Sequence, residues 1–258
     1  MQAPRKIAVA GATGRLGRHL VEVLAGDGHE VVAMSRATGV DIVTGEGLAA
    51  ALPGVECIID AATGPSPDQQ EATEFFTSAA RNLHEAGDRV GVKQMIVVSI
   101  IGIDRFTGGY SAAKLAHEQA MLSGPIPVEV VRAAQFHEFV AQLVDWGRQG
   151  DVSYVQQMRT QPVAARSLAV TVAGLVTNPD ASPTPGGAPF LEVAGPREES
   201  LVELARMLVA RRGDDLRIEG VSNPSDPDSL LSESGALLPG PGAILTGPTF
   251  AAWLDAGS

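Results

Sequence analysis

The chain lacks several features that would place it in other classes of protein. It contains one cysteine, Cys57, so no disulfide can form within the chain, and a reducing compartment is expected. No hydrophobic run approaches the roughly 20 residues of a membrane-spanning helix. The first predicted strand begins too near Met1 to leave room for a signal peptide. We therefore expect a cytoplasmic protein that has no membrane partner.

Basic residues are also scarce. The formal net charge is −11, because 30 acidic residues outnumber 19 lysines and arginines. Nucleic-acid-binding proteins usually present a basic face, so no nucleic-acid partner is expected, whereas a homo-oligomer stays open. The histidines show no spacing typical of metal ligands, either with one another or with Cys57, and we expect no metal site. These histidines are His19, His29, His84, His117 and His137.

The remaining composition is that of an α/β globular protein. Hydrophobic residues make up 45% of the 258, a length that fits one domain. Strand-like runs alternate with helical periodicity, which predicts a parallel sheet with helices on both faces. The predicted strands cover residues 7–10, 30–35, 57–61, 94–99, 128–131 and 190–193. The predicted helices cover residues 15–24, 47–52, 68–88, 111–122, 135–147, 167–176 and 200–211.

The alternation of strands and helices weakens after residue 132. We expect a single Rossmann-like, doubly wound domain over residues 1–258, to which residues of about 135–165 and 185–258 add a small C-terminal substrate lobe. Two stretches rich in proline and glycine interrupt this half. Residues 178–189 are predicted to be a surface loop, and residues 223–242 either a lid or an irregular tail.

Three glycines follow the first predicted strand at intervals of three residues. Gly11 can take the tight turn, Gly14 lets the backbone approach a pyrophosphate, and Gly17 lets the helix pack against the strand. The helix that begins here offers free N–H groups to an anion. The spacing differs from the usual G-x-G-x-x-G, and a plain strand–turn–helix connection is the alternative. We favour a nucleotide site.

The residues after the second predicted strand bear on the choice of nucleotide. Enzymes that use NAD commonly carry an acidic residue at this place, whereas an arginine accommodates a 2′-phosphate. Ser35 and Arg36 occupy it here. We expect a preference for NADP(H), with NAD(H) as the second option, and a solvated surface arginine is the alternative interpretation.

Tyr110 and Lys114 form a second group of candidate residues. A spacing of four on a helix places the phenol and the ammonium on one face. The ammonium is expected to lower the pKa of the phenol, so that Tyr110 exchanges a proton with a carbonyl or alcohol while a nicotinamide exchanges hydride. The chain has only two tyrosines and three lysines, which weakens the alternative of two unrelated surface residues. Ser99, which ends the preceding predicted strand, is either a donor to the substrate oxygen or a serine bonded to the backbone.

These motifs resemble those of the short-chain dehydrogenase/reductase superfamily, in particular its atypical NmrA-like branch. The resemblance rests on residues 11–17, 60–62, 97–102, 110–114 and 131–137. It implies a dinucleotide cofactor held by three segments and by Lys114, which would bind the nicotinamide ribose. The implied residues are Gly11, Thr13, Gly14, Arg15, Leu16 and Gly17 at the pyrophosphate, Ala61, Ala62 and Thr63 after the middle strand, and Ala133, Ala134, Gln135 and Phe136 beside the nicotinamide. The Asn-Ala-Ala-Gly often found after the middle strand is Asp60-Ala-Ala-Thr63 here.

The substrate is expected to meet residues after Gln135, with Phe136, His137 and Tyr154 as candidates. The resemblance implies an NADP(H)-dependent oxidoreductase that acts on a carbonyl, an alcohol or a quinone-like small molecule. Some NmrA-like proteins bind a dinucleotide without turning anything over, so a non-catalytic NADP(H) sensor is one alternative. The other is an epimerase or lyase that uses the cofactor transiently.

Overall fold

The computed structural model describes residues 3–177, 190–223 and 227–257, and these fall into two compact units. The first unit comprises Met1–Ser99, Gly108–Arg132 and Ala169–Leu191. The second comprises Ile100–Thr107, Ala133–Leu168 and Glu192–Ser258. The predicted surface loop at residues 178–189 lies outside the described residues. No helix in the described part of the chain is both long and apolar enough to cross a membrane.

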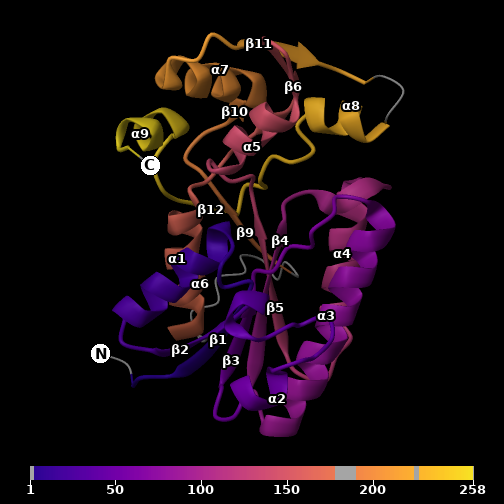
Figure 1. The fold of residues 1–258 in the computed structure, drawn as a ribbon, viewed down its shortest axis with the longest axis vertical. Coiled ribbons are helices and arrows are strands. Elements are labelled where there is room, and N and C mark those ends of the chain that lie inside the picture. The colour runs from indigo at the N-terminus through magenta and orange to yellow at the C-terminus, as the bar shows by residue number, and fades with distance from the viewer. Residues whose placement is uncertain (1–2, 178–189, 224–226, 258) are drawn as a thin grey trace. The chain divides into compact units, whose positions relative to one another are not determined.

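A parallel β-sheet with helices on both faces forms the first unit. The strands follow the spatial order β5-β4-β3-β1-β2, and β1 pairs in parallel with both β2 and β3. Figure 1 shows α1 on one side of this sheet, with α3 and α4 side by side on the other. The strands are β1 (Lys6–Ala10), β2 (Glu30–Met34), β3 (Cys57–Asp60), β4 (Gln94–Ile100) and β5 (Val128–Ala133). The helices are α1 (Arg15–Gly26), η1 (Arg36–Thr38), α2 (Leu48–Ala51), α3 (Gln69–Val90), α4 (Gly109–Leu122) and α6 (Ala165–Thr177), which enters this unit at Ala169.

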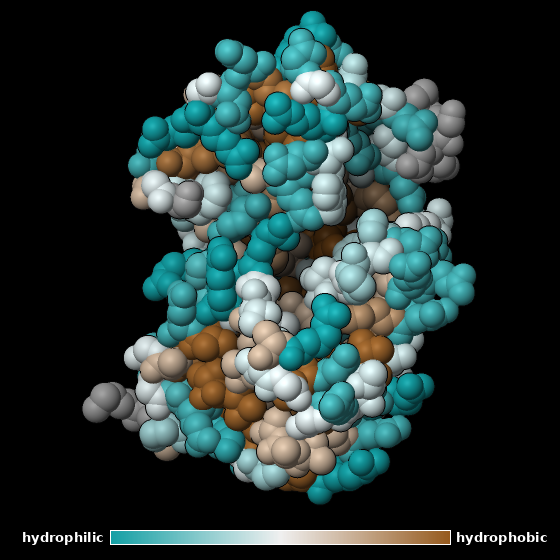
Figure 2. Space-filling model, viewed as in Figure 1, coloured by the Kyte–Doolittle hydropathy of each residue, from teal (hydrophilic) through white to brown (hydrophobic). Residues whose placement is uncertain are grey.

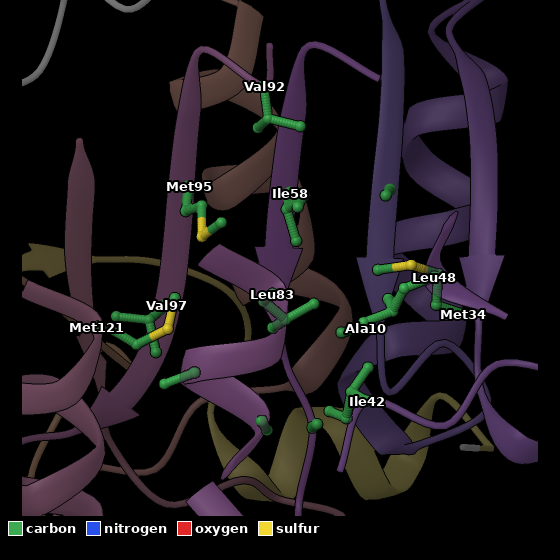
Figure 3. Close-up of a cluster of buried hydrophobic side chains, with 14 of the residues drawn as sticks. Ala10, Met34, Ile42, Leu48, Ile58, Leu83, Val92, Met95, Val97 and Met121 are labelled. Atoms are coloured by element: carbon green, nitrogen blue, oxygen red, sulfur yellow. The ribbon is translucent and has the colours of Figure 1, made fainter. Parts of the chain in front are cut away.

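The strands of this sheet are mostly apolar because helices cover both faces. All four residues of β3 are buried, and only the first residue of β1 is partly exposed. Figure 3 shows side chains from the strands meeting those of α2, α3 and α4 in one core cluster. Each large apolar side chain buried there contributes about 1.5–3 kcal/mol. The labelled members are Ala10, Met34, Ile42, Leu48, Ile58, Leu83, Val92, Met95, Val97 and Met121.

The second unit consists of short strands and helices. Strand β7 pairs antiparallel with β6 and parallel with β11, β8 pairs with β10, and β9 pairs with β12. Side chains of α5, α7 and α9 pack on β7 and β11 to form its core. Its elements are η2 (Ile103–Arg105), α5 (Phe139–Trp146), β6 (Arg148–Gln149), β7 (Val152–Gln156), β8 (Arg159–Thr160), β9 (Leu191–Ala194), β10 (Glu199–Ser200), α7 (Leu201–Arg212), β11 (Arg217–Val221), α8 (Pro227–Glu233), β12 (Ile244–Leu245) and α9 (Phe250–Asp255). Figure 2 shows hydrophilic residues interspersed with hydrophobic patches on the visible face.

The predicted elements of the first unit are confirmed within about two residues at each end, whereas the second unit brings corrections. The helix expected at residues 135–147 begins only at Phe139. The preceding backbone instead pairs with an extended segment, because Val163 N donates to Gln135 O and His137 N donates to Val163 O. The stretch at residues 223–242 contains the helix α8, so it is not an irregular tail.

Candidate active site

The turn after β1 is built around Gly11. Its φ of 74° lies in the left-handed region, and its N–H donates to the carbonyl of Met34 at the end of β2. A Cβ at this position would lie 2.7 Å from the Cα of Ala62. Only glycine therefore lets the turn approach the loop after β3 this closely.

Helix α1 presents an open amino end next to this turn. Gly14 precedes the helix without a side-chain cap, and the first turn of α1, all of it described, holds no acidic residue. The N–H groups at this end can therefore meet an anion. Leu16 is buried, so it can offer only its backbone. At Gly17 a Cβ would lie 2.0 Å from Gly11 O, which is why the helix packs so closely on the turn.

The end of β2 places Ser35 and Arg36 in the first unit with the glycine turn. Ser35 is the N-cap of η1, and its backbone N–H donates to Thr38 Oγ1 at 2.9 Å. Arg36 is exposed, and no carboxylate among the described residues pairs with its guanidinium. An unpaired guanidinium can donate two parallel N–H groups to two oxygens of a phosphate.

Tyr110 lies in the first turn of α4 and is half-buried. Its ring packs edge-on against Phe76 of α3, with the ring centres 5.8 Å apart. Its hydroxyl hydrogen-bonds the side chain of Thr63, in the loop after β3. Burial nevertheless raises the pKa of Tyr110 above its ordinary value, and the negative charge of Asp60 adds to this rise. The expected lowering of this pKa by Lys114 is therefore wrong.

The ammonium of Lys114 has other partners. The side chain is 4% exposed, and Nζ donates to the carbonyl of Val98 at 2.8 Å and to Nδ1 of His117 at 3.1 Å. It also lies 4.5 Å from the centre of the Phe76 ring. Burial lowers the pKa of Lys114 to about 8, although the charges of Asp60 and Glu118 offset part of that effect.

Asp60 and His117 belong to the same cluster, and the sequence analysis missed their part in it. Nε2 of His117 lies 3.0 Å from Oδ2 of Asp60, and the imidazole stacks on the Phe76 ring with the ring centres 4.5 Å apart. Asp60 Oδ1 accepts the backbone N–H of Ala62 at 2.9 Å. Two sequence features could have indicated the pair: His117 follows Lys114 by three residues on a helix, and Asp60 replaces the asparagine of the related pattern.

Ser99 lies near the end of β4 and is 3% exposed. Its Oγ has no hydrogen-bond partner within the described part of the chain. A buried hydroxyl without a partner is uncommon and costs free energy. The alternative of a serine bonded to the backbone is therefore not what the structure has.

The other predicted residues lie in the second unit, apart from Thr13 and Arg15, which are exposed beside the glycine turn, and Ala61, which is partly buried directly after β3. Ala133 and Ala134 are buried, and Gln135 accepts a hydrogen bond from Thr160. His137 is buried against Phe250 and Trp253, and its Nε2 lies 3.1 Å from Pro248 O. The remaining candidates are Phe136, which pairs with Val163, and Tyr154, which is 37% exposed on β7.

Comparison with known proteins identifies the class. Residues 11–179 match the NAD(P)H-binding family, and the chain therefore belongs to that family. A segment of 110 residues is 30% identical to the photosystem II assembly factor Ycf39 of Synechocystis sp.. That segment covers 37% of this chain and only 34% of the length of Ycf39.

Solved structures share the fold over nearly the whole chain. A GDP-6-OMe-4-keto-L-xylo-heptose reductase from C. jejuni superposes with a TM-score of 0.72 at 14% identity, covering 100% of this chain and 99% of the reductase. A dTDP-4-dehydrorhamnose reductase from Bacillus anthracis, solved with NADP, gives 0.71 at 18% identity over 98% of each chain. A UDP-N-acetylglucosamine 4-epimerase from Bacillus cereus gives 0.67 at 18% identity, covering 98% and 94%. These likenesses confirm the predicted Rossmann-like fold.

Proposed function

We propose that this protein is an NADP(H)-dependent oxidoreductase of the atypical short-chain type, acting on a carbonyl, an alcohol or a quinone-like small molecule. The observation that carries the proposal is the buried ammonium of Lys114, four residues after Tyr110 on α4. Removing an ammonium from water costs several kcal/mol, so an apolar side chain would serve stability better at this position. A role in chemistry accounts for the lysine.

The cofactor-binding residues follow from the shape of the first unit. The backbone of the turn from Gly11 to Gly17 suits a pyrophosphate, because its three glycines carry no side chains and α1 begins after Gly14 without a side-chain cap. Arg36 would pair with a 2′-phosphate, which favours NADP(H) over NAD(H). The loop Ala61–Thr63 would line the dinucleotide, and Lys114 would donate to a ribose hydroxyl. The bound nicotinamide would supply or accept the hydride.

Tyr110 would act as the acid. Because its pKa is raised, the phenol carries its proton at neutral pH and can donate it to a carbonyl oxygen during reduction. The unpartnered hydroxyl of Ser99 would hydrogen-bond the same oxygen. Phe136, His137 and Tyr154 remain the proposed contacts of the substrate.

The test is a screen of aldehydes, ketones and quinones that follows NADPH absorbance, repeated on Tyr110→Phe. We expect turnover to fall by about two to four orders of magnitude, the usual contribution of a general acid. NADPH affinity, measured by fluorescence titration, should stay within about twofold, because the phenol oxygen contributes little to dinucleotide binding. Unchanged turnover in Tyr110→Phe would refute the role of Tyr110.

One observation favours a second candidate function. The relative that is 30% identical over 110 residues is named an assembly factor, which suits an NADP(H)-binding protein whose partners change with the redox state of the nucleotide. Tight NADPH binding without turnover of any substrate in the screen would support it. An epimerase or lyase would instead convert its substrate with no net consumption of NADPH.

A further inference from the structure

Three buried side chains of the first unit, Asp60, His117 and Lys114, are joined in series by hydrogen bonds. Asp60 at the end of β3 meets His117 of α4, and His117 meets Lys114 one turn earlier on the same helix. Their side chains are between 0% and 4% exposed. We propose that Asp60 and His117 are positioning residues that hold the Lys114 ammonium with a single donor left for the bound nucleotide or the tyrosine. The second half of this proposal rests on the proposed function.

The direction of each hydrogen bond is fixed by the chemistry of the two ends. An ammonium can only donate, so Nδ1 of His117 accepts from Lys114. A carboxylate can only accept, so Nε2–H of His117 donates to Asp60. The imidazole is therefore neutral, with its proton on Nε2, and it lies between one positive and one negative charge.

The pKa shifts agree with these charge states. Burial lowers the pKa of His117, and the nearby Lys114 charge lowers it further, so the ring stays neutral. Burial by itself raises the pKa of Asp60, but the hydrogen bond and electrostatic interaction with His117, the hydrogen bond from Ala62 and the charge of Lys114 bring it below its ordinary value. Each group is thus held in the form that the hydrogen-bond directions require.

The hydrogen-bond donors of the Lys114 ammonium show how His117 holds it in place. An ammonium has three N–H donors. The carbonyl of Val98 takes one and His117 takes a second, which leaves one. The Phe76 ring lies against both Lys114 and His117, so this side of the ammonium is closed to water. Without His117, a second N–H of the Lys114 ammonium would lack an acceptor, and the side chain could rotate toward another acceptor nearby.

Asp60 also fixes the loop that carries Thr63. Its second oxygen accepts the N–H of Ala62, and Thr63 is the hydrogen-bond partner of the Tyr110 hydroxyl. One buried carboxylate is therefore linked to Lys114 through His117 and to Tyr110 through the loop. These two contacts are a reason for aspartate at position 60. An asparagine has one oxygen and one NH₂ group, so it cannot accept hydrogen bonds at both positions.

The direct test is the titration of Lys114 in the intact protein, which requires no substrate. The chain has only three lysines, so isotope labelling of lysine gives three side-chain NMR signals, and Lys114→Met identifies one of them. The charged and titratable groups facing Lys114 are Asp60 from β3 and His117 and Glu118 from its own helix. Lys6 and Lys93 serve as internal references.

We expect Asp60→Asn and His117→Leu each to lower the pKa of Lys114 by about one unit or more, because the first removes a negative charge and the second removes an acceptor. His117→Gln, which restores an acceptor, should recover part of that loss. His84→Leu is the matched control: His84 is also buried in the first unit, but its Nε2 contacts the carbonyl of Met121. The control should leave the Lys114 titration unchanged.

An unchanged Lys114 titration in both Asp60→Asn and His117→Leu overturns the proposal. If His117→Leu does not fold, the nearly isosteric Asp60→Asn decides the question alone. NADPH affinity gives a second readout. It should fall as the pH rises, and the fall should begin at a lower pH in Asp60→Asn than in the wild type, because Lys114 loses its charge earlier in the variant. Should the titration shift as expected while the screen finds no substrate that is turned over, the positioning of Lys114 stands and the proposed function fails.

Discussion

Replacing Gly17 by alanine should disrupt both stability and nucleotide binding. The added Cβ would lie 2.0 Å from Gly11 O, where a carbon and an oxygen not bonded to each other need about 3.3 Å. Either α1 or the turn must therefore move by about 1.3 Å, since neither partner is a side chain that can rotate away. Forcing extra volume into a packed site costs about 1–3 kcal/mol, and the rigid backbone on both sides places this case near the upper end.

The same helix supplies a matched control in Gly26. It is the last residue of α1, and a Cβ built there meets nothing within 4 Å. Alanine should be neutral or stabilising at this position by up to about 1 kcal/mol, because it has the higher helix propensity. Urea unfolding followed by circular dichroism compares the two variants under identical conditions.

Nucleotide binding separates local strain from a general loss of stability. The displaced N–H groups of α1 should weaken NADPH binding in Gly17→Ala at temperatures where the variant remains folded, whereas Gly26→Ala should bind as the wild type does. Gly17→Ala could instead unfold at the same urea concentration as Gly26→Ala and bind NADPH equally well. In that case the close packing of α1 on the turn determines neither the stability of the protein nor its nucleotide binding.

Three further outcomes are expected. NADPH should bind more tightly than NADH, and Arg36→Ala should reduce that preference about tenfold, the contribution of one charge-assisted hydrogen bond, as measured by fluorescence titration. Burial raises the pKa of Cys57 to about 12, so iodoacetamide at pH 8 should leave the native protein unmodified and alkylate it fully in urea, as seen by mass spectrometry. Arg132→Met should lower the free energy of unfolding by about 3–5 kcal/mol because it leaves the Glu118 carboxylate buried and unpaired. Adding Glu118→Met should restore most of that loss, and a second variant no more stable than the first would contradict this account.

Much of the first unit could be predicted from the sequence because its strands are mostly apolar runs and its turns carry glycine. Both features are local, so neither requires knowledge of the fold. The second unit was harder to predict for a physical reason. Strands such as β6 and β8 are only two residues long, too short for any alternation of polar and apolar residues to be detected.

The candidate active site could likewise be predicted only in part. Tyr110 and Lys114 share one helix, so their spacing alone brought them together in the sequence analysis. The direction of the Tyr110 pKa shift could not be predicted because it depends on what Lys114 contacts instead. Asp60, which adds to the rise of the Tyr110 pKa, lies 57 residues from His117 along the chain. Only the packing of α4 on the sheet brings the two residues together. Helical periodicity gives no information on such a contact.

The choice of lysine at position 114 also has a physical basis. The chain uses arginine for nearly all its positive charges and carries only three lysines. Val98 O and His117 Nδ1 each accept one hydrogen bond from the ammonium, so two of three donors are satisfied. An arginine would bring five donors in a flat fork to the same two acceptors and would leave three of them buried without partners. Its charge could not be lost either, whereas burial brings the pKa of Lys114 to about 8. The surroundings of Lys114 therefore suit a compact cation that keeps one donor beyond the two that Val98 and His117 satisfy.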